Sequence, residues 1–118
     1  MSLFEELKEL GVDIDGGLKR IGGNEKLYTR LLGKFIDAVN SYNVQADFDA
    51  ADCKEVIEKT HALKGTSGNL SLTPIYEAYT KIVDLLRADK PEEARAILID
   101  ILPVQEKIVN CIKSHMEQ

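Results

Sequence analysis

The segment 61–70 holds residue types that suit the transfer of a phosphoryl group. A histidine that is exposed to water carries a partly neutral imidazole near neutral pH and is a competent nucleophile. Phosphoryl transfer depends mainly on positioning and on neutralising the charge of the phosphoryl oxygens. Lys64, three residues after His61, can reach back to those oxygens with its ammonium group. We therefore expect His61 to be the phosphoryl acceptor and Lys64 to stabilise the phosphoryl group.

Two glycines lie within the helix that the spacing of apolar residues predicts around His61. In a helix interior, each glycine costs about 1 kcal/mol relative to alanine, so a role other than stability is expected for Gly65 and Gly68. At about 100° per residue, both glycines and Lys64 fall within about 60° of His61 around the helix axis. The glycines are thus expected to clear space for a docking protein, with Ile57 as an exposed apolar residue at the rim. The core-facing stripe, centred about 130° away, consists of Val56, Thr60, Leu63, Ser67 and Leu70.

Apolar residues recur at helical spacing along almost the whole chain, and strand-like alternation is lacking. In the first part, the pattern predicts a short helix over 3–10 that Gly11 ends. A short turn over 15–21 follows, with Asp15 as its cap. Asn24 is then expected to be the N-cap of a long helix that runs to about Tyr42.

Three further helices are predicted in the second part of the chain. The first, over about 53–70, is expected to be capped by Asp49 or Asp52. Thr73 and Pro74 are typical of the N-cap and first turn of the next helix. The last helix follows a turn over 89–91, and Pro103 is expected to kink or split it. Because the connections are short, the expected fold is all-α, an antiparallel four-helix bundle with one or two short N-terminal helices, in a single domain over 1–118.

Composition narrows the class of protein. The chain has 118 residues, of which 44% are hydrophobic and 30% charged, a balance typical of one globular domain. A net charge of -5, with basic residues scattered among acidic ones, argues against a nucleic-acid partner. We find no apolar run of about 18 residues or more and no signal-peptide pattern, which predicts a cytoplasmic protein without membrane contact. Cys53 and Cys111 show no metal-binding spacing, so buried thiols are expected, with neither metal nor cofactor.

Residues 61–70, HALKGTSGNL, closely resemble the signature of histidine-containing phosphotransfer (HPt) domains, H-x-L-K-G-x-[SA]-x-x-[IL]. Residues 11–37 also look like the leading segment of that family. The resemblance implies a phosphorelay step in which His61 carries phosphate between aspartates of response-regulator receiver domains. It also implies that Lys64 supports the phosphoryl group, that Gly65 and Gly68 leave room for the receiver, and that Ser67 packs inward. Ser71-Leu72, Tyr79 and Val83 depart from the usual family residues, which affects the expected partner specificity more than the expected activity.

Two other functions remain open from the sequence. A phosphoacceptor domain of a chemotaxis-type kinase would receive phosphate directly from ATP in a histidine kinase core, and such domains are similar around the histidine. A non-catalytic helical adaptor would keep the fold and only dock, although the presence of both His61 and Lys64 argues against it. The chain has no P-loop pattern, so we expect no nucleotide site of its own. We expect a monomer, a solvated His115, and tyrosines 28, 42, 76 and 79 at the edge of the core.

Overall fold

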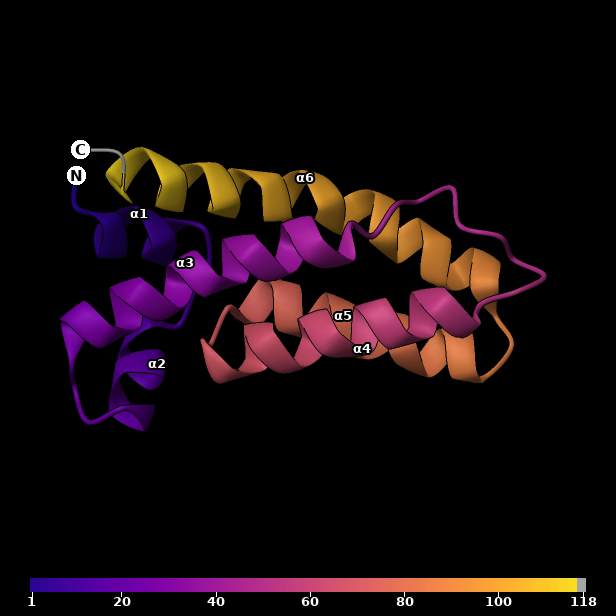
Figure 1. Cartoon of the computed structure of the whole chain (residues 1–118), viewed down its shortest axis with the longest axis horizontal. Coiled ribbons are helices and arrows are strands. Elements are labelled where there is room, and N and C mark those ends of the chain that lie inside the picture. The colour runs from indigo at the N-terminus through magenta and orange to yellow at the C-terminus, as the bar shows by residue number, and fades with distance from the viewer. Residues whose placement is uncertain (117–118) are drawn as a thin grey trace.

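The fold is all-helical, as the sequence predicts. The computed structural model describes residues 1–116, and this part of the chain contains helices, turns and loops but no strand (Figure 1). None of its helices combines the length and the apolar character that a membrane crossing requires. The helices are α1 (Leu3–Glu9), α2 (Ile14–Arg20), α3 (Glu25–Tyr42), α4 (Lys54–Asn69), α5 (Thr73–Arg87) and α6 (Pro91–Met116).

The two short leading helices are held by side-chain caps. Ser2 and Glu5 form a reciprocal capping box at the start of α1. Gly11 follows the end of α1 with φ +91°, a conformation that favours glycine, so the predicted stop is confirmed. The predicted cap of α2 is wrong: Asp13 rather than Asp15 accepts a hydrogen bond from the backbone N–H of Gly16, at 3.0 Å. The helix begins earlier than predicted because Ile14 is buried and belongs to its first turn.

The long helices begin and end close to the predicted positions. Asn24 caps α3 through the backbone N–H of Leu27, at 3.0 Å, and α3 ends at Tyr42, which confirms both predictions. The N-cap of α4 is Cys53, without a side-chain cap, so neither Asp49 nor Asp52 holds that position. Asp49 instead accepts a hydrogen bond from a backbone N–H group of the preceding turn, and Asp52 accepts one from the backbone N–H of the first residue of α4.

The predicted cap of α5 is wrong, and of the two outcomes expected at Pro103 in α6, a kink or a split, the split does not occur. Thr73 is the first residue of α5 rather than its cap, because its hydroxyl donates to the carbonyl of Ser71 instead of accepting from the helix. Leu72 holds the N-cap position and is fully buried. Pro103 does not split α6, which is one helix from Pro91 to Met116. Proline removes only its own backbone donor, and the surrounding turns of a long helix can continue past it.

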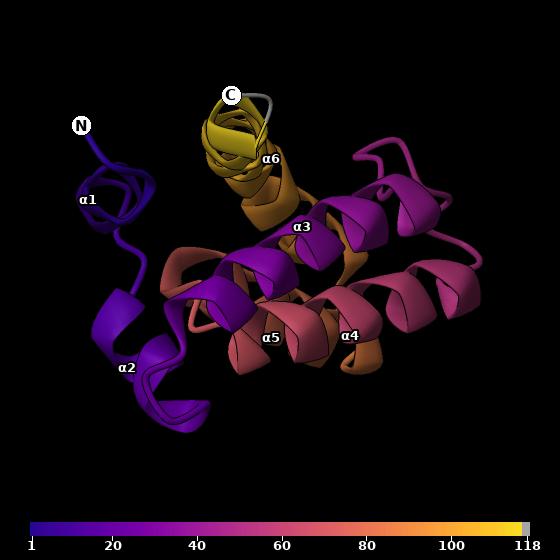
Figure 2. The ribbon, with the colours of Figure 1, turned by 60° about the vertical axis from the view of Figure 1, so that its left-hand side comes forward.

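The core lies between the four long helices. The most extensive packing joins α4 to α5 and α5 to α6, while α3 contacts both α4 and α6 (Figures 1 and 2). The predicted core stripe of α4 is confirmed, since all five of its residues are buried. Its two polar members, Thr60 and Ser67, are compatible with burial because their hydroxyls donate to backbone carbonyls one turn earlier, both at 2.7 Å.

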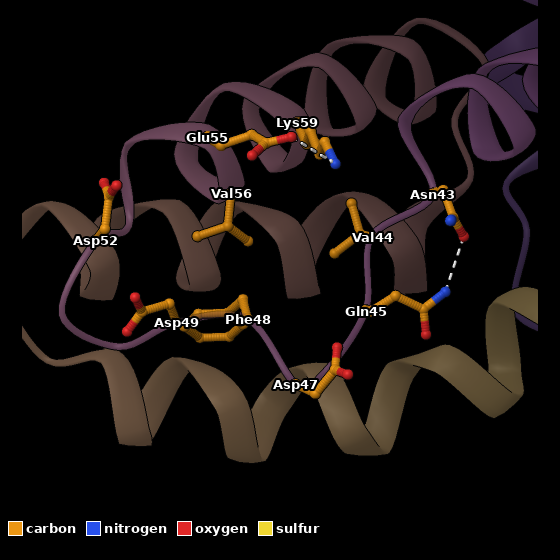
Figure 3. A pocket seen from close by; sticks show the side chains of 10 residues that line it. All are labelled: Asn43, Val44, Gln45, Asp47, Phe48, Asp49, Asp52, Glu55, Val56 and Lys59. Carbon is orange, nitrogen blue, oxygen red and sulfur yellow. Dashed lines mark hydrogen bonds and ion pairs between the residues drawn. The ribbon is translucent and has the colours of Figure 1, made fainter.

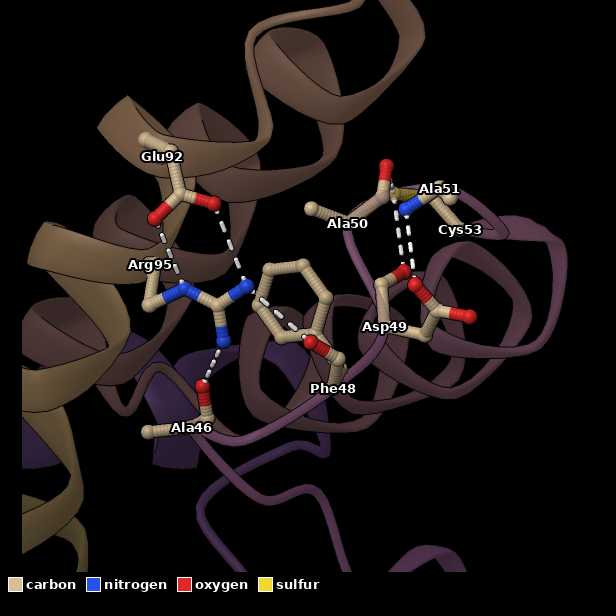
Figure 4. Close-up of polar contacts among 8 residues, drawn as sticks. All are labelled: Ala46, Phe48, Asp49, Ala50, Ala51, Cys53, Glu92 and Arg95. Atoms are coloured by element: carbon tan, nitrogen blue, oxygen red, sulfur yellow. Dashed lines mark hydrogen bonds and ion pairs between the residues drawn. The ribbon is translucent and has the colours of Figure 1, made fainter.

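The loop between α3 and α4 is fixed by a residue of α6 that the sequence pattern does not single out. Arg95 donates hydrogen bonds to the carbonyls of Ala46 and Phe48 and pairs with Glu92 at 3.0 Å (Figure 4). Its guanidinium group also lies 4.2 Å from the centroid of the Phe48 ring. One arginine thereby joins a loop without regular structure to the first turns of the last helix.

Two of the four tyrosines lie deeper than predicted. Tyr28 and Tyr79 are fully buried, whereas Tyr42 and Tyr76 are 37% and 39% exposed. Each buried hydroxyl donates a hydrogen bond at 2.6 Å, to the carbonyl of Leu70 and to Oε1 of Gln105 respectively. A tyrosine can enter a core fully when its hydroxyl finds such a partner, and the sequence alone does not identify the partner.

Replacing Tyr79 by phenylalanine is expected to lower the free energy of unfolding by about 1–3 kcal/mol, because the buried side chain of Gln105 would lose its hydrogen-bond partner. Both residues are buried, so water cannot easily replace the hydroxyl. Urea denaturation of the two proteins measures the difference. Tyr42→Phe is the matched control on an exposed tyrosine and should change the stability by less than about 0.5 kcal/mol. Equal stabilities of wild type and Tyr79→Phe would contradict the assigned hydrogen bond.

Candidate functional site

His61 lies exposed on α4 and lines a surface hollow of about 390 Å³. The hollow brings together the end of α2, the second half of α4 and the start of α5. Its lining includes the predicted site residues Lys64, Gly65 and Gly68, so four of the five candidate residues meet in one place. The rest of the lining comes from α2 and its cap, the end of α4, the turn that follows it and α5: Asp13, Arg20, Asn69, Ser71, Thr73 and Tyr76.

Two positively charged side chains line the hollow beside His61. Lys64 is half-buried on α4, and Arg20 comes from the last turn of α2. Nη1 of Arg20 donates a hydrogen bond to the carbonyl of Gly68 at 2.8 Å, which holds the guanidinium group at this face. Among residues 1–116, Asp13 is the one carboxylate that lines the hollow, and it already caps α2. The hollow therefore favours an anion and lacks a carboxylate cluster for a metal ion.

Arg20 is the site residue that sequence reasoning missed. It lies on α2, whereas the motif lies on α4, and the two are so far apart along the chain that the sequence does not indicate their contact. The only local signal is a pair of basic residues, Lys19 and Arg20, in the last turn of a helix, which is also a common way of matching the helix dipole. Only the packing of α2 near the end of α4 reveals the contact.

The two glycines have different surroundings. A Cβ atom at Gly65 would meet no atom within 4 Å, so the space beside His61 is open there as predicted. At Gly68, a Cβ atom would lie 3.0 Å from two ring carbons of Tyr76. The space at Gly68 is therefore narrower than predicted, because an aromatic ring of α5 takes part of it, although Gly68 still lines the hollow.

Ile57 also differs from its predicted position. It is half-buried and packs against the core instead of standing exposed, and it does not line the hollow. The helical angle placed it on the side of His61, but the core beneath α4 is wider than the stripe of five residues. The apolar group at the edge of the hollow is instead the exposed ring of Tyr76.

The end of α4 is held from three directions. The last carbonyls of a helix have no partner within the helix, and other elements must satisfy them. Arg20 of α2 binds the carbonyl of Gly68, and Tyr28 of α3 binds that of Leu70 at 2.6 Å. Burial raises the pKa of Tyr28 to about 12, so its hydroxyl remains a donor at neutral pH. With the Tyr76 ring against Gly68, these contacts fix the helix that carries His61.

A second hollow, of about 380 Å³, lies under the loop between α3 and α4 (Figure 3). Four carboxylates line it, from Asp47, Asp49, Asp52 and Glu55. All four residues are exposed, their side chains point away from one another in Figure 3, and Glu55 already pairs with Lys59 at 3.0 Å. They form no convergent site for a cation, and none of the residues around His61 takes part.

Replacing Gly65 by alanine is expected to raise the free energy of unfolding by about 0.5–1 kcal/mol, because alanine is the better helix former and its Cβ would meet open space. Gly68→Ala, the matched control in the same helix, should gain less because its Cβ would crowd the Tyr76 ring. Chemical denaturation of both variants measures the effect. A loss of stability in Gly65→Ala would show that the site is not open.

Comparison of the chain with models of protein families, with characterised proteins and with solved structures gave no match. The functional assignment therefore depends on the residues of the site and on the motif that they form.

Proposed function

We propose that the protein is a histidine-containing phosphotransfer domain in which His61 accepts a phosphoryl group from a receiver-domain aspartate and passes it to another receiver. One observation carries the proposal: an exposed histidine shares a hollow with two cations, next to a helical position that is open because it is glycine. The motif over residues 61–70, which resembles that of the HPt family, supports it.

The proposed reaction uses groups that the hollow provides. A ring nitrogen of His61 donates its lone pair to phosphorus, the P–N bond forms, and the P–O bond to the aspartate breaks to release a carboxylate. Lys64 and Arg20 neutralise charge on the phosphoryl oxygens during transfer. A magnesium ion for this step would come with the receiver, since the lining of the hollow has no carboxylate cluster.

The proposal also includes the arrangement of the helices, the cellular location, the oligomeric state and the docking surface. The four long helices would form an antiparallel four-helix bundle with α1 and α2 as leading helices, which fits the helix contacts seen here. The domain would act as a cytoplasmic monomer, with the face around His61 left free for successive receivers. Gly65 would lie under the receiver, and Tyr76 would form the apolar edge of the interface.

The proposal is tested by incubating the protein with a receiver domain phosphorylated by a small-molecule phosphodonor, and separately with ATP and a histidine kinase core. Label that reaches the protein from the receiver, and that acid removes but base does not, is expected. Label from ATP and the kinase core alone would instead support the chemotaxis-type phosphoacceptor. No label in either reaction, across a panel of receivers and kinase cores, would favour the docking adaptor and overturn phosphotransfer.

A further inference from the structure

A second group of reactive side chains lies where α1 meets the end of α6, away from the hollow of His61. Glu6 comes from α1, while Cys111 and His115 stand four residues apart on α6 and so share one face of that helix. Oε2 of Glu6 is 3.3 Å from the sulfur of Cys111 and 2.5 Å from Nε2 of His115. One ligand atom from each residue lies within 4.8 Å of the other two.

This arrangement differs from the sequence expectation for Cys111 and His115. His115 is only 19% exposed and is paired with Glu6, so the prediction of a solvated histidine is wrong. Cys111 is half-buried rather than buried, and it is not in a disulfide. The sequence predicts no metal site because the two cysteines do not form a closely spaced pair. However, a cysteine and a histidine one helical turn apart already provide two ligands. The third residue is 105 positions from Cys111, and only the contact between α1 and α6 brings it close.

Without a metal ion, the protonation states of the group favour a network of hydrogen bonds to Glu6. Burial and the hydrogen bond to Glu6 raise the pKa of Cys111 to about 11, so it is a neutral thiol at physiological pH. Hydrogen bonds from His115 and Cys111 lower the pKa of Glu6, which is therefore an ionised carboxylate. A soft sulfur, an imidazole nitrogen and a carboxylate oxygen around one point form a donor set that zinc prefers.

We propose that Glu6, Cys111 and His115 bind one Zn²⁺ ion that joins α1 to the end of α6. The thiol of Cys111 releases its proton to solvent and binds as a thiolate. Nε2 of His115 binds through its lone pair in the neutral ring, and Glu6 binds through a carboxylate oxygen. Water completes a tetrahedral site.

The geometry allows this change with small movements. Zinc bonds of about 2.0–2.3 Å place the ligand atoms of a tetrahedron about 3.3–3.8 Å apart. The 3.3 Å between Cys111 and Glu6 already agrees with this, and the 2.5 Å between Glu6 and His115 must widen. The ligand atoms of Cys111 and His115 lie within 4.8 Å of each other, so at most about 1–1.5 Å of approach is needed there. The side chain of Glu6 is 37% exposed and is free to turn by that amount. Surface hollows of about 400 Å³ beside Glu6 and Cys111, and of about 590 Å³ beside His115, give the ion and water access.

The proposed site would act on stability. Helix α1 has seven residues and is too short to be stable alone. It lies beside α6 in Figures 1 and 2, and a metal ion between the two helices would resist its local opening. Because the ligands are brought together only in the folded chain, zinc should raise the melting temperature in proportion to the free-energy gain from binding.

The test is a titration of the full chain with Zn²⁺ by calorimetry, with Co²⁺ as a spectroscopic substitute, together with melting curves. Wild type is expected to bind one ion per chain, to show the ultraviolet sulfur-to-cobalt band, and to melt at a higher temperature with zinc. Cys111→Ser should lose the band and the zinc-dependent shift, and His115→Gln and Glu6→Gln should bind at least about tenfold more weakly. Cys53→Ser, the matched control on the other cysteine, should behave as wild type.

Three results would overturn the metal site: no saturable binding by wild type, unchanged binding by Cys111→Ser, or loss of binding in His61→Gln. The last would place the ion at the hollow of His61 instead. Melting curves without metal show whether each variant is folded, so a failure to bind is not mistaken for unfolding. Phosphotransfer does not enter these measurements, and its failure would leave the result unchanged.

Discussion

Replacing His61 by glutamine is expected to reduce phosphate acceptance to background, because glutamine has similar size and polarity but no nucleophilic ring nitrogen. His61 is exposed, and within residues 1–116 its side chain makes no hydrogen bond or ion pair, so the substitution should change the free energy of unfolding by less than about 0.5 kcal/mol. The measurement is transfer of radiolabel from a phosphorylated receiver, with urea denaturation of the same preparation. Loss of label without loss of stability would locate the chemistry at this side chain.

His115→Gln is the matched control for that experiment. His115 is the other histidine of the chain and is held by Glu6 at the contact of α1 with α6. It does not line the hollow of His61, so its replacement should leave phosphate transfer as in wild type. If label survives in His61→Gln and disappears in His115→Gln, the phosphoryl acceptor is His115 and the proposed site is refuted.

Local features of the fold are predictable from sequence because their causes are local. The stripe of apolar and small polar residues along 56–70 predicts the fully buried face of α4, because it follows the helical period, although it misses the half-buried Ile57 at its edge. Asn24 predicts the start of α3 because an N-cap acts within one turn. Gly65 predicts an open position for a similar reason. Glycine destabilises a helix interior, and at a position away from the core face no packing contact explains its presence.

Contacts between distant segments are the features that sequence reasoning misses. Gly68 has the same residue type and the same helical face as Gly65, yet the ring of Tyr76 from the next helix takes up part of the space beside it. Arg20 enters the site through the packing of α2, and Arg95 fixes a loop through two carbonyls that any residue could offer. A backbone carbonyl carries no sequence signature, so these partners become visible only in three dimensions.

The cap of α2 shows a different limit. Asp13 and Asp15 are both suitable N-cap residues, and local propensity does not separate them. Asp13 is the cap because Val12 and Ile14 on either side of it are buried, which places the start of the helix against the core. The backbone N–H of Asp13 also bonds the carbonyl of Ser71, which ties this start to the turn after α4 and hence to the site.

Gly65→Glu is expected to slow phosphoryl transfer by about tenfold or more, a loss that corresponds to about 1.4 kcal/mol. The glutamate would stand one helical turn after His61, on the side from which a receiver must approach. Its length would fill the open space, and its charge would repel both the phosphoryl oxygens and the acidic phosphorylation site of a receiver. Single-turnover transfer from a phosphorylated receiver measures the rate, and a melting curve shows whether the fold is kept.

Gly65→Ala and Gly65→Gln separate the contributions to that loss. Alanine tests the helix backbone with little added volume, and glutamine adds the volume of glutamate without its charge. We expect transfer to fall in the order alanine, glutamine, glutamate, while none of the three variants is less stable than wild type, since all are better helix formers than glycine and a Cβ there meets no atom. Wild-type transfer by the glutamate variant would refute close approach at Gly65. A rate that falls only together with the melting temperature would show instead that the glycine serves the fold.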